Sequence, residues 1–245
     1  MRGGERRRRR QLLWWRYGAP HLARLSWRLG AGATAYSREV LYQNMFYQGL
    51  RAEGIERPFY ATRGAANFSL LYLLLRCMTE LPVRRVVELG AGQSSLLLDC
   101  LAKPRGIQCL SVEHDPQWAE RISAQVAHQV LLAPLVRRPV YGRLTTTYDL
   151  DPAACGPADL LLVDGPIGER RHSRRGALDW VAEALSPEHF LIVFDDAERP
   201  GEMDTIRAAV GQLERSGRAF GLRRLRAAHD QMLLAGGRLA PVLDF

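Results

Sequence analysis

A glycine-rich turn in the first half of the chain has the residue types of a cofactor-binding loop. It reads VVELGAGQSS from Val86 to Ser95. Gly90 can adopt backbone angles that are closed to other residues, and Gly92 lets a ligand approach the chain where a Cβ would block it. Ser94 or Ser95 can cap a helix that follows. A glycine pair of this kind also occurs for structural reasons alone, so its neighbours decide what it could bind.

Three neighbouring features favour a nucleoside that carries an amino acid over a dinucleotide. Ser95 stands where the fingerprint G-x-G-x-x-G has its third glycine, which counts against NAD or FAD. Glu88 precedes the glycines and can attract an ammonium group directly or through water. Glu113 follows about 20 residues on, the spacing at which a carboxylate reaches ribose hydroxyls. Asp115 is the alternative ribose contact, although we expect it to cap a helix that starts at Pro116.

Together these residues resemble motif I and the next acidic position of class I S-adenosylmethionine-dependent methyltransferases. The resemblance in element order spans roughly residues 83–236. It implies that Glu88 faces the methionine end of the cofactor, that the glycine loop wraps it and that Glu113 holds the ribose. Residues 133–135 would contact the adenine through backbone and apolar groups. The cofactor-binding residues that we expect are Glu88, Gly90, Ala91, Gly92, Ser94, Ser95, Glu113 and Asp164.

Two later apolar runs end in carboxylates that could take part in a reaction. Asp164 ends the run LLLVD, and Asp195 and Asp196 end the run LIVFDD. The carboxyl ends of neighbouring parallel strands meet at one edge of a sheet, where three carboxylates repel unless a cation or a proton neutralises them. Such an oxygen-rich group suits Mg²⁺ or another divalent cation, which could bind an acceptor hydroxyl and lower its pKa.

This placement resembles metal-dependent O-methyltransferases of the catechol and caffeoyl-coenzyme A type, which usually have Asn where this chain has Asp196. The resemblance implies a metal site at Asp164, Asp195 and Asp196, with Asp164 and Asp195 also acting in catalysis. In the alternative, Asp164 contacts the cofactor amine or the acceptor directly. Asp195 and Asp196 would then cap the helix that follows Pro200.

The acceptor is expected to be a small molecule with hydroxyl groups, such as a saccharide. The strings VDGPIG and DDAERPGE resemble, more loosely, sugar-directed methyltransferases such as those acting on glucuronoxylan, and Arg199 and Glu202 match that pattern. Arg199 would bind an acidic or hydroxyl-rich acceptor or form a surface salt bridge with Glu202. His172, on a loop between two glycines, is the candidate general base if no metal is used, and is otherwise a solvated side chain.

Short β-type runs alternate with amphipathic segments, which predicts an α/β fold. We expect a Rossmann-like class I methyltransferase fold, with a mostly parallel seven-stranded sheet, helices on both faces and an N-terminal helical extension. Strands are expected at 85–89, 108–113, 130–136, 159–164, 190–195, 220–225 and 231–235, with a loop through Tyr148. Helices are expected at 67–81, 94–102, 116–127, 176–185 and 202–216.

Charge divides the chain into a basic extension, residues 1–63, and a methyltransferase domain, residues 64–245. The extension holds 13 arginines against four glutamates. Its leucines at near-helical spacing predict one or two amphipathic helices, which could pack on the domain as a lid, remain disordered or lie on an anionic membrane surface. With no signal sequence or membrane span expected, we predict a cytoplasmic protein, with peripheral membrane contact through the basic arm as the alternative.

Nucleic acid is not expected as a partner. Amine methyltransferases of nucleic acids usually carry Pro-Pro and an aromatic residue after the fourth-strand acid, where this chain has Gly165-Pro166-Ile167. A Lys-Asp-Lys-Glu ribose methyltransferase needs two lysines, and Lys103 is the only lysine here. The alternative to an enzyme is a non-catalytic module of the same fold that docks on a membrane or protein partner through its basic arm. The oligomeric state is left open.

Overall fold

The computed structural model describes the backbone of residues 19–61 and 66–245, and side chains from residue 34 onward within those ranges. The helices are α2 (Ala19–Ala52), α3 (Phe68–Glu80), α4 (Gln93–Ala102), α5 (Pro116–Ser123), α6 (Ala177–Glu183) and α7 (Pro200–Arg215). Short 3-10 helices are η2 (Lys103–Arg105), η3 (Pro152–Cys155) and η4 (Gly237–Asp244). The strands are β1 (Arg85–Leu89), β2 (Gln108–Glu113), β3 (Gln129–Leu132), β4 (Leu135–Val140), β5 (Arg143–Tyr148), β6 (Leu160–Val163), β7 (Phe190–Phe194), β8 (Gly221–Leu225) and β9 (Gln231–Gly236).

Seven strands form one sheet in the order β3-β2-β1-β6-β7-β9-β8. The first five run parallel, and β9 runs antiparallel to both β7 and β8. This confirms the predicted seven-stranded, mostly parallel sheet. The strand order reverses between β1 and β6, and open sheets bind ligands at the carboxyl ends of the strands at such a reversal. The loops that follow β1 and β6 therefore lie at the expected ligand position.

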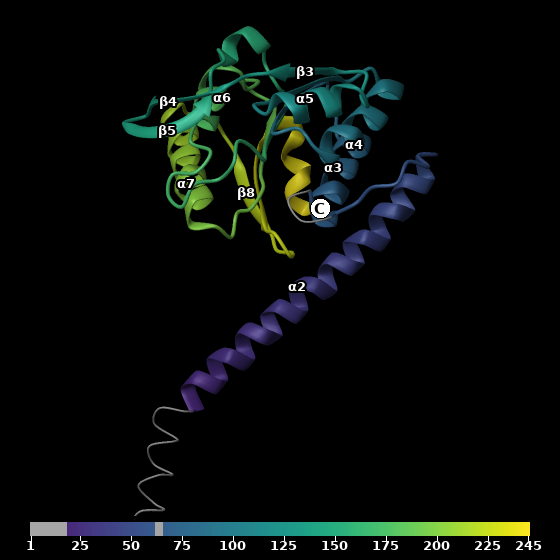
Figure 1. Ribbon diagram of the computed structural model, residues 1–245, viewed down its shortest axis with the longest axis vertical. Coiled ribbons are helices and arrows are strands. Elements are labelled where there is room, and N and C mark those ends of the chain that lie inside the picture. The colour runs from purple at the N-terminus through teal and green to yellow at the C-terminus, as the bar shows by residue number, and fades with distance from the viewer. Residues whose placement is uncertain (1–18, 62–65) are drawn as a thin grey trace, which may run out of the picture.

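Alternate residues of the central strands enter two separate cores, because successive side chains point to opposite faces of a sheet. Val86 and Leu162 pack in one core with α3, α4 and the end of α2. Val87 and Leu161 pack in the other with α6 and α7. Figure 1 shows these helices on opposite sides of the sheet, as predicted. Strands buried on both faces explain the continuous apolar runs of the sequence.

The segment after β3 differs from the sequence expectation. The predicted strand 130–136 is two strands, because Pro134 interrupts the run, and β4 leaves the main sheet. The predicted loop through Tyr148 contains β5, which pairs antiparallel with β4 as a hairpin. Tyr141 and Gly142 form its turn with positive φ angles of 44° and 75°, as a two-residue hairpin turn requires. Because β5 ends at Tyr148, the hairpin places that residue at the start of the crossover to β6.

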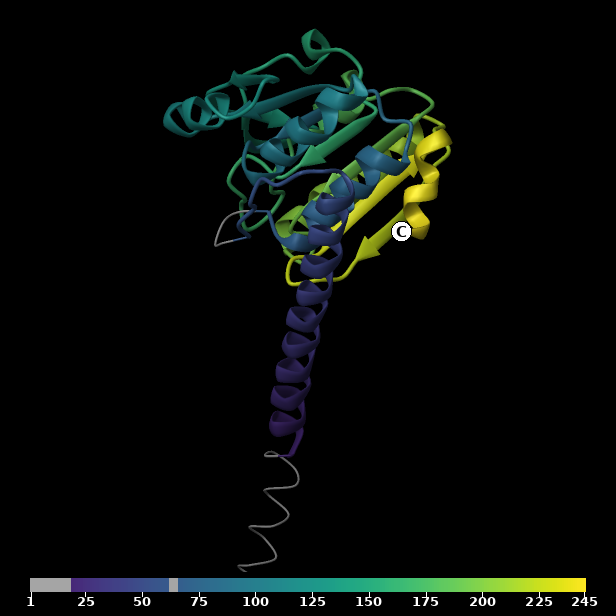
Figure 2. The same ribbon diagram turned by 90° about the vertical axis from the view of Figure 1, so that its right-hand side faces the viewer.

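From residue 19 the described part of the chain begins with one long helix, α2, which extends well beyond the sheet and its covering helices (Figures 1 and 2). Its last turns pack against the sheet domain, because Phe46 and Leu50 are buried in the first core. Earlier in the helix, large apolar side chains are exposed, namely Tyr36, Val40 and Leu41. The described part of the chain contains no helix long and apolar enough to cross a membrane. The arginine run of the predicted membrane contact lies outside the described residues, so that contact, like the boundary at residue 63, stays a prediction.

Candidate functional site

The loops after β1 and β6 touch through two glycines. Gly90 has a φ angle of +94°, a region that favours glycine. A Cβ at Gly90 would lie 2.9 Å from the backbone nitrogen of Gly165 and 3.0 Å from the carbonyl carbon of Asp164. Any side chain at Gly90 would therefore separate the two loops. Their close approach brings Glu88, at the end of β1, and Asp164, after β6, to one crevice.

Glu88 is fully buried and has one oxygen without a partner. Its Oε2 accepts hydrogen bonds from the hydroxyls of Ser95 and Ser111, the second at 2.6 Å. Its Oε1 has no hydrogen-bond partner among the described residues. Burial raises the pKa of Glu88 to about 7, although hydrogen bonds from serine hydroxyls, that of Ser111 first, oppose the shift. A buried carboxylate oxygen without a donor is costly, and a bound cation would supply the missing partner.

The turn into α4 leaves room for a ligand at Gly92. A Cβ at this position would meet no atom within 4 Å. The backbone nitrogen of Gly92 donates a hydrogen bond to Ser95 Oγ at 2.9 Å, which caps the helix start. Of the two serines considered as caps, Ser95 makes this bond. The open space beside Gly92 therefore lies next to the buried carboxylate of Glu88.

Glu113 closes the same side of the crevice from the end of β2. Its Oε2 accepts from the backbone nitrogen of Ala91 at 3.1 Å, and its Oε1 accepts from the backbone of His114 and Asp115 at 2.7 and 2.9 Å. These bonds tie the carboxylate to the glycine loop. Asp115 caps α5, because its side chain accepts from the backbone nitrogen of Trp118, as expected. Glu113 is thus the acid of this pair that lies beside the loop.

Tyr148 is a residue of this crevice that the sequence analysis missed. Its side chain is 2% exposed, and its hydroxyl has no partner among the described residues. A Cβ on Gly165 would lie 2.3 Å from that hydroxyl, so the phenol reaches the contact between the two loops. Burial raises the pKa of Tyr148, so the hydroxyl stays protonated. It is a free donor and acceptor beside Gly165.

The three predicted strand-end carboxylates do come together. Oxygens of Asp164, Asp195 and Asp196 lie within 4.8 Å of one another. Burial, and then the neighbouring Asp195, raise the pKa of Asp164 well above its usual value. Burial, and then Asp196, raise the pKa of Asp195 to about 6. Asp195 is held by Gln231, whose side-chain amide donates to Asp195 Oδ1 at 2.8 Å.

A buried arginine that the sequence analysis missed lies among these carboxylates. The Arg174 guanidinium lies 3.2 Å from Asp164 Oδ1 and 3.0 Å from Asp196 Oδ2. It also donates to the carbonyl oxygen of Pro166 at 3.2 Å. The side chain is 6% exposed, and the backbone φ is +53°. Arg174 therefore supplies a positive charge among the carboxylates of Asp164, Asp195 and Asp196, called the carboxylate group below, where we predicted a divalent cation.

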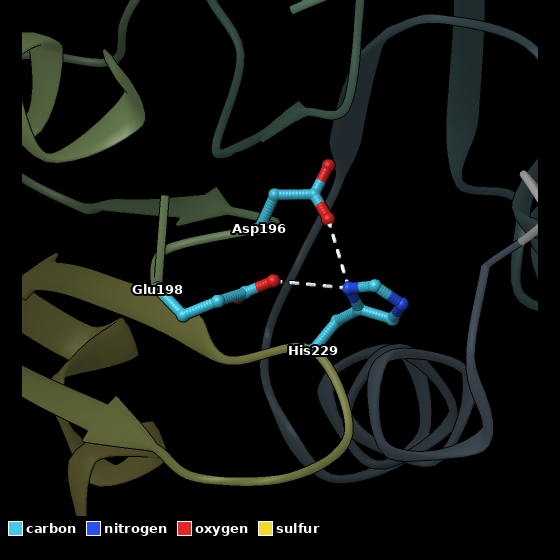
Figure 3. Close-up of side chains that lie close together, drawn as sticks. All are labelled: Asp196, Glu198 and His229. Carbon is cyan, nitrogen blue, oxygen red and sulfur yellow. Dashed lines mark hydrogen bonds and ion pairs between the residues drawn. The ribbon is translucent and has the colours of Figure 1, made fainter. Parts of the chain in front are cut away.

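Asp196 binds further cations on its outer side. Arg199 lies 2.7 Å from its Oδ2, and His229 Nδ1 lies 3.2 Å from its Oδ1 and 3.0 Å from Glu198 Oε1 (Figure 3). Hydrogen bonds to Asp196 and Glu198 raise the pKa of His229 to about 10. A protonated imidazole therefore bridges the two carboxylates at neutral pH. These three side chains also form a second group whose donor atoms could hold a metal ion.

His172, the candidate base, lies on the flank of α7. Its backbone nitrogen donates to Asp204 Oδ2 at 3.2 Å, and its Nδ1 lies 3.7 Å from the same oxygen. Arg171 also binds Asp204 through two nitrogens. No polar contact among the described residues joins His172 to Asp164. The structure thus does not bring His172 together with the carboxylate group.

A cavity of about 580 Å³ lies beside the carboxylate group. Two loop segments line it: Gly168, Glu169, Arg170, Arg171, Arg199, Pro200, Gly201 and Glu202. Arg199 pairs with Asp196 rather than with Glu202. Glu202 instead accepts a hydrogen bond from Ser173 Oγ at 2.8 Å. The cavity therefore has guanidinium and carboxylate groups on its walls and adjoins Asp196.

A solved methyltransferase shares this fold. An O-methyltransferase from Bacillus cereus, in complex with SAH, matches with a TM-score of 0.51 and 14% identity over 84% of this chain and 99% of that chain. The chain has the class I methyltransferase fold. A SAH-bound methyltransferase from Podospora anserina matches with a TM-score of 0.47 and 13% identity over 79% and 88% of the two chains. A methyltransferase from Pyrococcus furiosus matches with 0.46 and 11% over 79% and 96%. No protein-family model and no curated protein match the sequence.

The two glycines of the loop are expected to respond differently to a Cβ. Gly90→Ala forces a β-carbon against the backbone of the β6 loop at a positive φ, so we expect a loss of stability of at least about 1 kcal/mol. Gly92→Ala serves as the matched control, because its Cβ meets no atom, and its melting temperature should equal that of the wild type. Thermal unfolding followed by circular dichroism measures both. Equal melting temperatures for the two variants would contradict the contact between the loops.

Proposed function

We propose that this protein is an S-adenosylmethionine-dependent methyltransferase that methylates a hydroxyl group of a small acceptor. The observation that carries the proposal is the unpartnered Oε1 of the buried Glu88, beside a glycine loop at the point where the strand order reverses. A ligand ammonium group would give this oxygen the hydrogen-bond donor that it lacks. The shared fold of SAH-bound methyltransferases supports the same conclusion.

The residues of the crevice fit the cofactor. Glu88 would hold the ammonium group of the cofactor. The open space at Gly92 would let the cofactor lie against the backbone of the loop. Glu113, whose carboxylate is bound to the glycine loop, would accept hydrogen bonds from the ribose hydroxyls. The free hydroxyl of Tyr148 would hydrogen-bond to the cofactor where the two loops meet. When bound, S-adenosylmethionine would supply a methyl group on a positively charged sulfur, and that sulfur is a good leaving group when an oxygen attacks the methyl carbon.

The residues at the end of β6 and β7 would align the acceptor and accept its proton. A carboxylate here would accept the proton that the acceptor hydroxyl loses as its oxygen takes the methyl group from the sulfur of the cofactor. Asp164 is suited to this role, because its carboxyl is 24% exposed while burial raises its pKa. Asp195, which is buried and bound by Gln231, would help to keep the pKa of Asp164 raised, because two neighbouring carboxylates repel each other.

We propose that Arg174, rather than a divalent cation, neutralises the carboxylate group. Its guanidinium already binds Asp164 Oδ1 and Asp196 Oδ2. The second oxygen of Asp196 binds His229, and Asp195 Oδ1 is used by Gln231. Mg²⁺ takes six ligands, several of them water, but at these carboxylates it would lie against the positive charge of Arg174. The donor set therefore does not suit a resident cation while Arg174 stays in place.

The cavity of about 580 Å³ is the proposed acceptor site. Its guanidinium and carboxylate groups can donate to and accept from hydroxyl groups, which suits a saccharide or another hydroxylated metabolite. Arg170 on its wall has no polar partner among the described residues, and so remains free to bind an acceptor. Mass spectrometry of cell extracts incubated with labelled cofactor would identify the acceptor.

Cofactor binding should depend on Glu113 but not on Asp196. Calorimetric titration with S-adenosylmethionine should show binding to the wild type and to Asp196→Ala. In Glu113→Ala we expect affinity to fall by roughly tenfold or more, equivalent to about 1.4 kcal/mol, because the ribose contact and the support of the glycine loop are lost. Failure of the wild type to bind would contradict the proposal and favour a non-catalytic module of the same fold.

Catalysis should need an ionised Asp164. Because the pKa of Asp164 is raised, the rate should increase with pH through a value above the usual aspartate range and fall on acidification. Asp164→Asn should lower kcat by roughly 100- to 10,000-fold, the usual worth of a positioned base. The exposed Asp244→Asn is the matched control. A kcat for Asp164→Asn near that of the control would exclude the proposed role.

Methyl transfer should survive the removal of divalent cations. With Arg174 in the position of a cation, the wild-type rate should be the same before and after treatment with excess chelator. Arg174→Ala should lose activity, because the carboxylates then repel one another. Activity that disappears on chelation and returns with added Mg²⁺ would show that Arg174 does not replace the metal.

A further inference from the structure

A chain of hydrogen-bonded side chains connects Glu88 to the edge of the domain. Glu88 Oε2 lies 2.6 Å from Ser111 Oγ, and Ser111 Oγ lies 3.0 Å from His128 Nε2. His128 Nδ1 lies 3.1 Å from Asp99 Oδ1. The four residues come from β1, β2, the segment before β3, and α4. Nothing in the proposed methyl transfer uses the last three of them.

Burial changes along this chain. Glu88 and Ser111 are fully buried, whereas the side chains of His128 and Asp99 are 8% and 18% exposed. Asp99 also accepts from the backbone nitrogens of Ala127 and His128 at 2.7 and 3.1 Å. Although burial raises the pKa of Asp99, these bonds outweigh it and leave the pKa below its usual value. Asp99 is therefore a fixed negative end, and the proton positions can differ only between Glu88 and His128.

The single hydroxyl proton of Ser111 couples these two positions. If Glu88 is ionised, the Ser111 hydroxyl donates to it, and Ser111 Oγ accepts a hydrogen bond from Nε2–H of His128. Because Nδ1–H donates to Asp99, that histidine is then positively charged. If Glu88 carries a proton and donates it to Ser111, the serine donates to Nε2 of a neutral His128. In both arrangements every contact is satisfied, and one proton is shared between Glu88 and His128.

The groups around the pair favour the arrangement with the proton on Glu88 in the free protein. Burial raises the pKa of Glu88 to about 7, and burial lowers the pKa of His128. Glu113, Asp164 and Tyr148 also face Glu88 from β2, the β6 loop and β5, and the acids among them oppose its ionisation. Cys109, on β2 opposite Val86, stays a neutral thiol, because burial raises its pKa to about 12.

We propose that binding of the cofactor's ammonium group at Glu88 moves this proton through Ser111 to His128, so that the protein ionises Glu88 without releasing a proton to the solvent. The proton leaves Glu88 Oε2 for Ser111 Oγ, as the serine's own proton passes to His128 Nε2. The ammonium charge reverses the preference, since an opposite charge within about 4–6 Å favours the ionised carboxylate. His128 is thus a positioning residue for the proton, and its role rests on the proposed cofactor site.

The proton balance of binding tests this proposal. S-adenosylhomocysteine, which has the same ammonium group, is titrated calorimetrically into the protein at a pH below the Glu88 pKa of about 7. The titration is repeated in two buffers of different ionisation enthalpy. For the wild type the observed enthalpy should be the same in both buffers, because no proton leaves the protein. For His128→Asn it should differ by nearly the full difference between the ionisation enthalpies of the two buffers, because Glu88 must then release almost one proton per ligand to the buffer.

Two further variants keep the test decisive. Ser111→Ala interrupts the chain but leaves His128 present, and it should also release nearly one proton. His189→Asn, at a partly exposed histidine far along the sequence from these residues, should bind without proton release, like the wild type. Equal proton release by the wild type and His128→Asn, with tight binding in both, would overturn the relay but not the cofactor site. A wild type that does not bind the ligand at all would overturn both.

Discussion

A buried guanidinium holds the carboxyl edge of this sheet together. Arg174 binds Asp164 and Asp196, which follow two different strands, and donates to the carbonyl of Pro166 in the loop between them. Removing a charge from water costs several kcal/mol unless well-placed partners offset it. Here the arginine and the carboxylates offset each other. The path of the loop from β6 to α6 follows from this pairing, including the positive φ that brings Arg174 inward.

The two halves of the crevice have opposite electrostatic arrangements. Around Asp164 and Asp196 the protein supplies its own cations, in Arg174, Arg199 and His229. Around Glu88 the near donors that the structure describes are neutral hydroxyls, and the carboxyl has a raised pKa. A cationic ligand is therefore favoured beside Glu88, whereas the acids around Asp164 and Asp196 already have cations of the protein as partners. This difference separates a site for binding the cofactor from a site for aligning an acceptor.

The sheet and the strand-end acids could be predicted from the sequence because both have local signals. Buried parallel strands appear as apolar runs, and the acids follow those runs directly. The hairpin was missed because its second strand, RLTTTY, is polar and follows the interruption at Pro134. Arg174 was missed because it lies in a run of charged residues, ERRHSRR, that is typical of a solvated loop. Tyr148 and His128 carry no motif, and only the tertiary fold places them beside Gly165 and Ser111.

The position of the ligand ammonium group tests the account most directly. A crystal structure of the complex with S-adenosylhomocysteine should place that nitrogen within hydrogen-bonding distance of Glu88 Oε1, directly or through one water, with the ribose hydroxyls at Glu113 and Arg174 still between Asp164 and Asp196. A complex in which the ammonium group binds elsewhere, and Glu88 Oε1 remains without a partner, would contradict the account.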